Sequence, residues 1–160
     1  MNLFIKQKIF SWKDRFFVYN ENGEVVYEVE GELFSWGAKI HIYNRYEREL
    51  FYIKQKLMCF LPEYEIYRNE TLYARVKKEL SFITPKLNVS SNCGDFVMKG
   101  DFLSMDFSIE CNNVLIGEIH KKWFTWGDTY CLTVVDNEDS AFFTAMVIAI
   151  DHCLHNESEC

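Results

Sequence analysis

The sequence predicts a mostly β protein, in which a closed antiparallel barrel of about twelve strands surrounds one C-terminal hydrophobic helix. Three observations predict this fold. Short motifs recur along the chain and divide it into three similar units. Within the units, apolar and polar residues alternate with the period of two that half-buried strands show. After the third unit comes a segment that is apolar all round, yet shorter than the about 20 residues that span a bilayer.

The repeat is clearest in the motif Ile-Lys-Gln-Lys, which begins at Ile5 and again at Ile53. A weaker echo begins at Met98, where a lysine follows the apolar residue. A second motif, Phe-Ser-Trp-Gly at Phe34–Gly37, matches Phe-Thr-Trp-Gly at Phe124–Gly127. Repeated motifs of this kind indicate a fold built from equivalent structural units.

Each unit is expected to contain four short strands. In the first unit, residues 15–20 are rich in aromatic and β-branched types, and apolar residues alternate with glutamates over 25–30. Asn22-Gly23 between them is a strong hairpin signal, because both residues tolerate a positive φ. In the second unit the frame of residues 64–67 stays open. We assign a single domain over 1–160, with repeats at about 1–49, 50–93 and 94–138 and a helix at about 139–155.

The tail is predicted to be the central helix. Asp139 or Ser140 can cap it, and Thr144 is the single polar residue of 141–150. A helix without a hydrophilic face must be buried. A sheet that closes around it would bury that helix and leave no sheet edge exposed.

The Ile-Lys-Gln-Lys start, the block Trp123–Tyr130 and the terminal apolar helix together resemble the LURP-one-related family, which belongs to the tubby C-terminal-like superfamily with the phospholipid scramblases. The resemblance covers essentially the whole chain. It implies a twelve-stranded barrel around a central hydrophobic helix and little about activity. The tubby branch binds phosphoinositide headgroups through a basic patch, but its binding residues have no evident positions here, and the net charge of −7 argues against a simple transfer.

The net charge and the lack of targeting signals argue against several classes of protein. A net charge of −7 disfavours nucleic-acid binding, which needs a positive surface. Residues 1–10 lack a long apolar core, so no signal peptide is expected, and no segment is long enough to span a membrane. The six cysteines include no Cys-x-x-Cys pair. We therefore expect a cytoplasmic protein with reduced thiols, which is not transmembrane.

No motif for catalysis, a metal or a cofactor stands out. His152 and His155 have helical ligand spacing, but a metal site needs three or four ligands. His41 and His120 are expected on outer strand faces. The Trp-Gly pairs Trp36-Gly37 and Trp126-Gly127 are expected to pack the end of the barrel and to let the chain turn, rather than to stack a ligand. We expect no catalytic residues, no metal, no cofactor and no enzymatic activity.

The charge is unevenly distributed along the chain. The three units carry −1, +3 and −5, and the tail carries −4. The second unit therefore offers a candidate lipid-binding surface, if its strands bring their cations together. The candidate residues are Lys54, Lys56, Arg75, Lys77, Lys78 and Lys86. Lys121 and Lys122 form a smaller pair in the acidic third unit.

The sequence thus favours a non-catalytic binding or scaffold module, with a protein or an anionic membrane surface as its partner. One alternative is weak binding of anionic, phosphoinositide-like headgroups at the basic surface of the second repeat. The other is a small-molecule enzyme or carrier that uses the mouth of the barrel; a helix in the bore would weaken it.

Overall fold

The computed structural model describes residues 1–6, 15–32, 34–79, 86–101, 104–124, 127–135 and 138–155. Within these residues the chain forms twelve strands and one helix. They are β1 (Asn2–Lys6), β2 (Arg15–Asn20), β3 (Val25–Gly31), β4 (Lys39–Asn44), β5 (Glu49–Gln55), β6 (Glu63–Arg68), β7 (Thr71–Glu79), β8 (Lys86–Ser91), β9 (Gly94–Asp101), β10 (Asp106–Cys111), β11 (Val114–Phe124), β12 (Gly127–Val134) and α1 (Ser140–His155).

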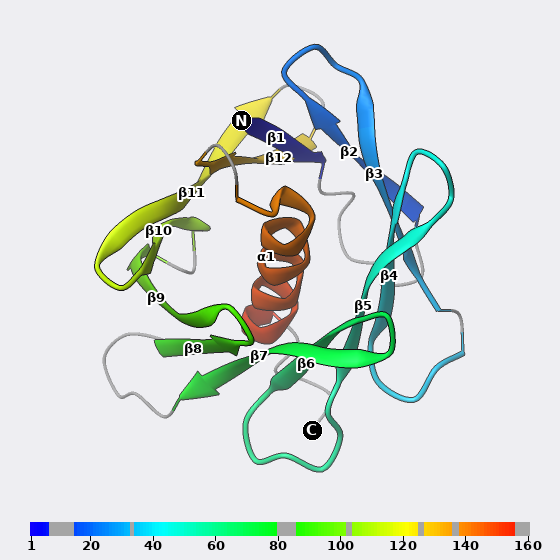
Figure 1. The fold of residues 1–160 in the computed structure, drawn as a ribbon, viewed down its shortest axis with the longest axis vertical. Helices are drawn as coiled ribbons and strands as arrows, with labels where there is room; N and C mark the ends of the chain where they lie inside the picture. The colour runs from blue at the N-terminus through cyan, green and yellow to red at the C-terminus, as the bar shows by residue number, and fades with distance from the viewer. Residues whose placement is uncertain are drawn as a thin grey trace.

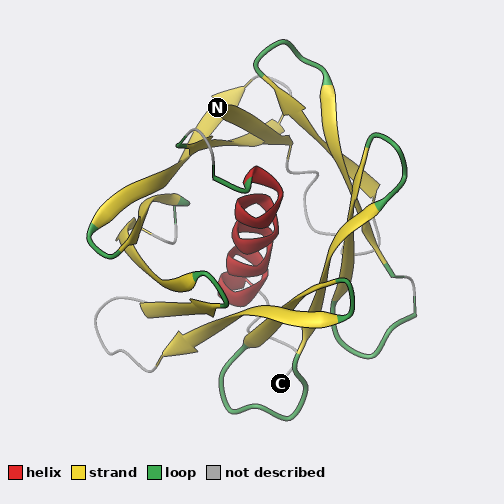
Figure 2. Cartoon of the chain, viewed as in Figure 1, coloured by secondary structure: helices red, strands yellow, loops and turns green. Residues whose placement is uncertain are grey.

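The strands close into a barrel around the helix, as the sequence predicts. Each strand pairs antiparallel with the next, and β12 pairs with β1. Figure 1 shows the ring of strands in chain order, and Figure 2 shows the helix enclosed by it. Because the strands alternate in direction, the tight turns from β2–β3 to β10–β11 share one end with the start of α1. We call this the turn end. The β3–β4 and β5–β6 loops lie at the opposite end, the loop end.

The repeat seen in the sequence appears in the structure as equivalent buried positions. Val29, Val76 and Ile119 are aligned in the three units and lie buried on β3, β7 and β11. Ile5 and Ile53 are likewise buried on β1 and β5. In the second unit the open frame is resolved, because Tyr64 and Ile66 of β6 are buried in the core. Glu65 and Tyr67 therefore lie on the outer face.

Four hairpins carry a β-bulge that the alternation does not predict. The register shifts in β2–β3, β4–β5, β6–β7 and β10–β11, each time by one extra residue. These residues are Val26, Leu50, Tyr73 and Ile116, and all four are buried in the core or packed against it. A bulge bends its strand and directs an additional side chain to one face. Here it adds apolar bulk around the helix.

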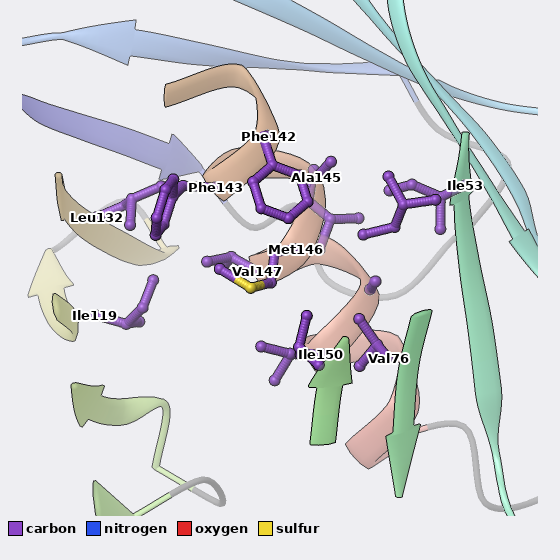
Figure 3. Packing of buried hydrophobic residues seen from close by; sticks show 14 of the residues in the cluster. Ile53, Val76, Ile119, Leu132, Phe142, Phe143, Ala145, Met146, Val147 and Ile150 are labelled. Atoms are coloured by element: carbon purple, nitrogen blue, oxygen red, sulfur yellow. The ribbon is translucent and has the colours of Figure 1, made fainter. Parts of the chain in front are cut away.

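The helix fills the bore with apolar side chains. Ala145, Met146, Ala149 and Ile150 are completely buried. Figure 3 shows Ala145, Met146 and Ile150 among residues from strands around the barrel, including Ile53 and Leu132. Thr144 is also buried, but its hydroxyl donates to the carbonyl of Ser140 at 2.8 Å. The one polar side chain in this stretch is thereby satisfied within the helix.

Candidate binding surfaces

The basic surface predicted from the second unit is interrupted by acids. Strand β6 lies between β5 and β7, so that Lys54, Glu65 and Arg75 form one cross-strand row. Arg75 Nε lies 3.3 Å from Glu65 Oε1. The cation of β7 in this row is therefore paired with the carboxylate beside it, while Lys54 is exposed and forms no ion pair within the described residues.

The second row follows the same pattern. Lys56 Nζ lies 3.0 Å from Glu63 Oε1, and this hydrogen bond raises the pKa of the Lys56 ammonium above its usual range. Lys77 stands opposite Glu63 in the register and is exposed, with no ion-pair partner in the described part of the chain.

The two remaining candidates differ in their surroundings. Lys78 is half-buried close to Cys153, and its charge is among the influences on that thiol. Lys86 pairs with Glu79 along the backbone, and its side chain lies outside the described part. The structure thus brings Lys54, Lys56, Arg75 and Lys77 onto one outer face, interleaved with two glutamates.

A second candidate surface was missed by the sequence analysis. Large apolar side chains are exposed on the β3–β4 and β5–β6 loops, at the loop end of the barrel. We call this group the apolar rim; its members are Phe34 (91% exposed), Trp36 (88%), Leu57 (44%), Met58 (fully exposed) and Phe60 (86%). Contiguous exposed apolar groups on a soluble domain mark interaction sites.

The two loops touch one another. A methyl group built on Gly37 would lie 2.8 Å from Leu57 Cδ2. The backbone N–H of Ala38 donates to Oε1 of Gln55, the buried last residue of β5, at 2.9 Å. Figure 2 draws both loops in green, projecting beyond the strands at the lower right and the bottom. The apolar rim is therefore one continuous feature rather than two separate exposed loops.

Both loops are closed at their base by the same pair of contacts. In the β3–β4 loop, Glu32 N–H donates to the Lys39 carbonyl at 2.9 Å, and Lys39 Nζ lies 3.0 Å from Glu32 Oε2. In the β5–β6 loop, Lys56 N–H donates to the Glu63 carbonyl at 2.9 Å, beside the Lys56–Glu63 ion pair. A backbone hydrogen bond and an ion pair thus hold the ends of each loop together.

The backbone within the rim is strained. Phe34 has a φ of 62° and Met58 a φ of 63°, in the left-handed region that bulky residues rarely adopt. Such conformations cost about 1–3 kcal/mol each and concentrate at functional sites. Here they occur at the side chains that project furthest into solvent.

One expectation about the Trp-Gly pair is wrong and the other is confirmed. Trp36 does not pack the end of the barrel, since 88% of it is exposed. Gly37 does let the chain turn, with a φ of 76°. The backbone of Gly37 lies close to the Leu57 side chain, while the indole of Trp36 remains outside the core. Trp126, the counterpart in the third unit, lies outside the described residues.

His41 and His120 lie beside carboxylates on the outer face of the barrel. His41 Nδ1 is 2.7 Å from Glu49 and its Nε2 is 3.1 Å from Glu32, while the ring stacks on Tyr52 at 4.8 Å. His120 lies 2.8 Å from Asp106 and is half-exposed. Across the described chain, no group of three His, Cys, Asp or Glu side chains could hold a metal ion. Nor is any helix in that part long and apolar enough to cross a membrane.

Comparisons with known proteins place this geometry in context. The profile described as LURP-one-related matches residues 1–151. The uncharacterized protein YxjI of Bacillus subtilis (strain 168) is 33% identical over 159 residues, which covers 99% of this chain and 97% of that protein. An X-ray structure of an Arabidopsis thaliana protein superposes with a TM-score of 0.68 over 94% of this chain and 88% of its own, at 17% identity. That last similarity shows a shared fold.

Proposed function

This chain belongs to the LURP-one-related family, and from that premise we propose that it is a non-catalytic binding module that works through the outside of its barrel. The observation that carries the proposal is the filled bore. Side chains of α1 such as Met146 and Ile150 are completely buried where a barrel-mouth enzyme or carrier would hold its ligand. The exposed charged and apolar groups described above lie on the outer strands and the loops.

The proposal includes two finer statements. We place the barrel in the tubby C-terminal-like superfamily, on the resemblance of its motifs and its central helix. We also propose that it works in the reducing cytoplasm. The described cysteines support this, because Cys59, Cys93, Cys111, Cys131 and Cys153 are all free thiols.

Native mass spectrometry of the purified protein distinguishes a non-catalytic binding module from a small-molecule enzyme or carrier. We expect the mass of the chain alone. A small molecule that co-purifies in stoichiometric amount, and that is released only on unfolding, would overturn the proposal. Affinity capture from the native cell extract, together with a lipid-overlay screen, then looks for the partner.

A second candidate function is weak binding of anionic phospholipid headgroups at the basic surface. The exposed Lys54 and Lys77 favour it, because within the described residues neither has an ion-pair partner. Each such cation near an anionic membrane contributes about 1 kcal/mol. The interleaved Glu63 and Glu65 reduce the total, so the binding is expected to be weak and to fall steeply with salt.

Vesicle co-sedimentation at low and at physiological salt tests this candidate. Replacing Lys54, Lys56, Arg75 and Lys77 together by Gln should abolish headgroup binding, because it removes all four cations of this face. The matched control, Lys99→Gln, removes an exposed cation from the acidic third unit, where it is paired with Glu110 at 2.7 Å. Equal binding by the four-residue variant and the wild type would exclude the basic surface.

A further inference from the structure

We propose that the apolar rim inserts into the interface of an anionic lipid bilayer, while Lys54 beside the base of its loops contacts the headgroups. This inference rests on the proposed function and names the partner of the module. It differs from headgroup binding at the basic surface, because the attachment is made by apolar side chains at the loop end of the barrel.

The chemistry of the side chains fits a bilayer interface. Tryptophan and phenylalanine favour the boundary between headgroups and acyl chains, and the rim presents Trp36 together with Phe34 and Phe60. The rim is convex, since its most exposed side chains project from loops with 86% or more of their surface in water. Fluid lipid can close around separate projecting side chains, whereas a protein partner would need a matching cavity for each. Removing them from water supplies the attachment.

The loops are already ordered for insertion. Their ends are clamped by Glu32–Lys39 and Lys56–Glu63, and Ser35 Oγ donates to the Gly37 carbonyl at 2.7 Å within the first loop. The positive φ of Phe34 and Met58 orients these two residues before any partner arrives. An ordered loop loses less conformational entropy on binding than a flexible one.

The charge distribution favours an anionic surface at the same place. Lys39 and Lys54 are cross-strand neighbours on β4 and β5, and Lys56 follows at the loop base. Of these three lysines, Lys39 and Lys56 are paired with acids, whereas Lys54 has no ion-pair partner among the described residues and remains available to a headgroup.

Co-sedimentation with phosphatidylcholine vesicles, with and without phosphatidylglycerol, tests the proposal. The rim variant replaces Phe34, Trp36, Met58 and Phe60 by Ser. We expect its affinity for the anionic vesicles to fall at least about tenfold, since burying one large apolar side chain corresponds to roughly that factor. A matched control replaces four exposed apolar residues near the turn end by Ser, namely Val25, Tyr46, Val114 and Leu115. It should bind as the wild type does.

Fluorescence provides a second measurement that does not depend on affinity. An indole that leaves water emits at shorter wavelength, so wild-type emission should shift to the blue on addition of anionic vesicles. The shift should largely disappear in Trp36→Phe, which keeps an aromatic ring and should keep most of the binding. The salt dependence of binding distinguishes the apolar rim from the basic surface. Apolar insertion persists at physiological salt, whereas headgroup attraction is screened.

Three results would overturn the insertion proposal. They are a wild type that does not bind anionic vesicles at low salt, a rim variant that binds as well as the wild type, and a Trp36 emission that stays unchanged on binding. A different result would exclude insertion but support the binding module. In that case the wild type does not bind vesicles but captures a protein from extract, and the rim variant fails to capture that protein. A small ligand in the bore would exclude the module itself.

Discussion

At the scale of single residues, the start of the helix is fixed by contacts to neighbouring strands as well as by its own capping residue. Asp139 Oδ1 accepts from the Phe142 N–H at 3.2 Å, and its Oδ2 lies 3.0 Å from Arg68 Nη1 on β6. The Arg68 guanidinium also lies 5.3 Å from the ring of Phe51 on β5. One carboxylate therefore joins the helix N-terminus to the barrel wall.

We expect Asp139→Ala to destabilise the protein by about 1–2 kcal/mol, because the helix loses its N-cap and Arg68 its carboxylate partner. Urea unfolding measures the change. Asp139→Asn is the control, since asparagine also caps helices while lacking the charge. It should recover most of the loss; if Asn is as harmful as Ala, the ion pair rather than the cap supports the helix.

Gly100 on β9 shows a position where a side chain has no room. Its φ is 141°, and a Cβ built there would lie 2.4 Å from the carbonyl oxygen of Asp106. Gly94 has a φ of 127°, but its added Cβ would meet only Cys111 Sγ at 3.4 Å. The two glycines thus share a backbone conformation and differ in the space around them.

Gly100→Ala should therefore cost more than about 2 kcal/mol, because it adds a backbone clash to the strain of a positive φ. Gly94→Ala carries the strain without that clash and should cost clearly less. Thermal unfolding of both variants makes the comparison. If Gly100→Ala and Gly94→Ala lose the same amount of stability, β9 and β10 move apart freely at Gly100.

At the scale of the elements, the barrel and the helix depend on each other. The inner faces of the strands find their apolar partners on α1, and the helix has no hydrophilic face through residues 141–150. The bulges strengthen this dependence, because they turn side chains such as Leu50 and Tyr73 toward the helix. Tyr73 packs edge-on against Phe142 with 4.9 Å between the ring centroids.

Ending the chain after Glu138 should leave an unfolded or aggregated protein, because the strands would surround an empty apolar bore. Ile148→Asp should cost at least about 4 kcal/mol, since it buries an unpaired charge, whereas Ile148→Val should cost only about 1 kcal/mol. Size-exclusion chromatography and thermal unfolding report the result. A monomeric truncated chain that melts cooperatively near the full-length protein would contradict this view of the core.

At the scale of the whole molecule, burial and local contacts make the fold sensitive to alkali. Burial raises the pKa of the Cys153 thiol from its usual value near 9 to about 12. Burial and the hydrogen bond to Cys93 raise the pKa of Tyr73 to about 12 as well, and burial raises that of Tyr27. The native state keeps all three groups protonated at pH values where an unfolded chain would ionise them.

The stability linked to these groups is fully present below about pH 9 and is lost as the pH rises through 12. We expect the denaturant midpoint to fall steadily over that window. Cys153→Ala should make the fall shallower, whereas Cys59→Ala, which removes a thiol from the β5–β6 loop, should leave it unchanged. Parallel curves for wild type and Cys153→Ala would show that burial of this thiol does not control the alkaline transition.

The fold could be predicted from the sequence alone, because the information that specifies it is local and periodic. Alternation of period two defined the strands, and the repeated buried positions Val29, Val76 and Ile119 defined three equivalent units. The apolar stretch in 141–150 required a buried helix, and a closed sheet provides its surroundings. These features follow from each segment's own residues.

The candidate binding surfaces could not be derived from the sequence, because they depend on which strands and loops become neighbours. The sequence gathered cations in the second unit, but strand pairing placed Glu63 and Glu65 between them. The sequence predicts that Trp36 packs the end of the barrel. In the structure Gly37 lies against Leu57, and the indole of Trp36 is in solvent. The apolar rim joins two loops that are separate in the sequence, and aromatic residues beside Gly37 and Pro62 were its sole sequence signal. Exposure is set by long-range packing, and no local pattern encodes it.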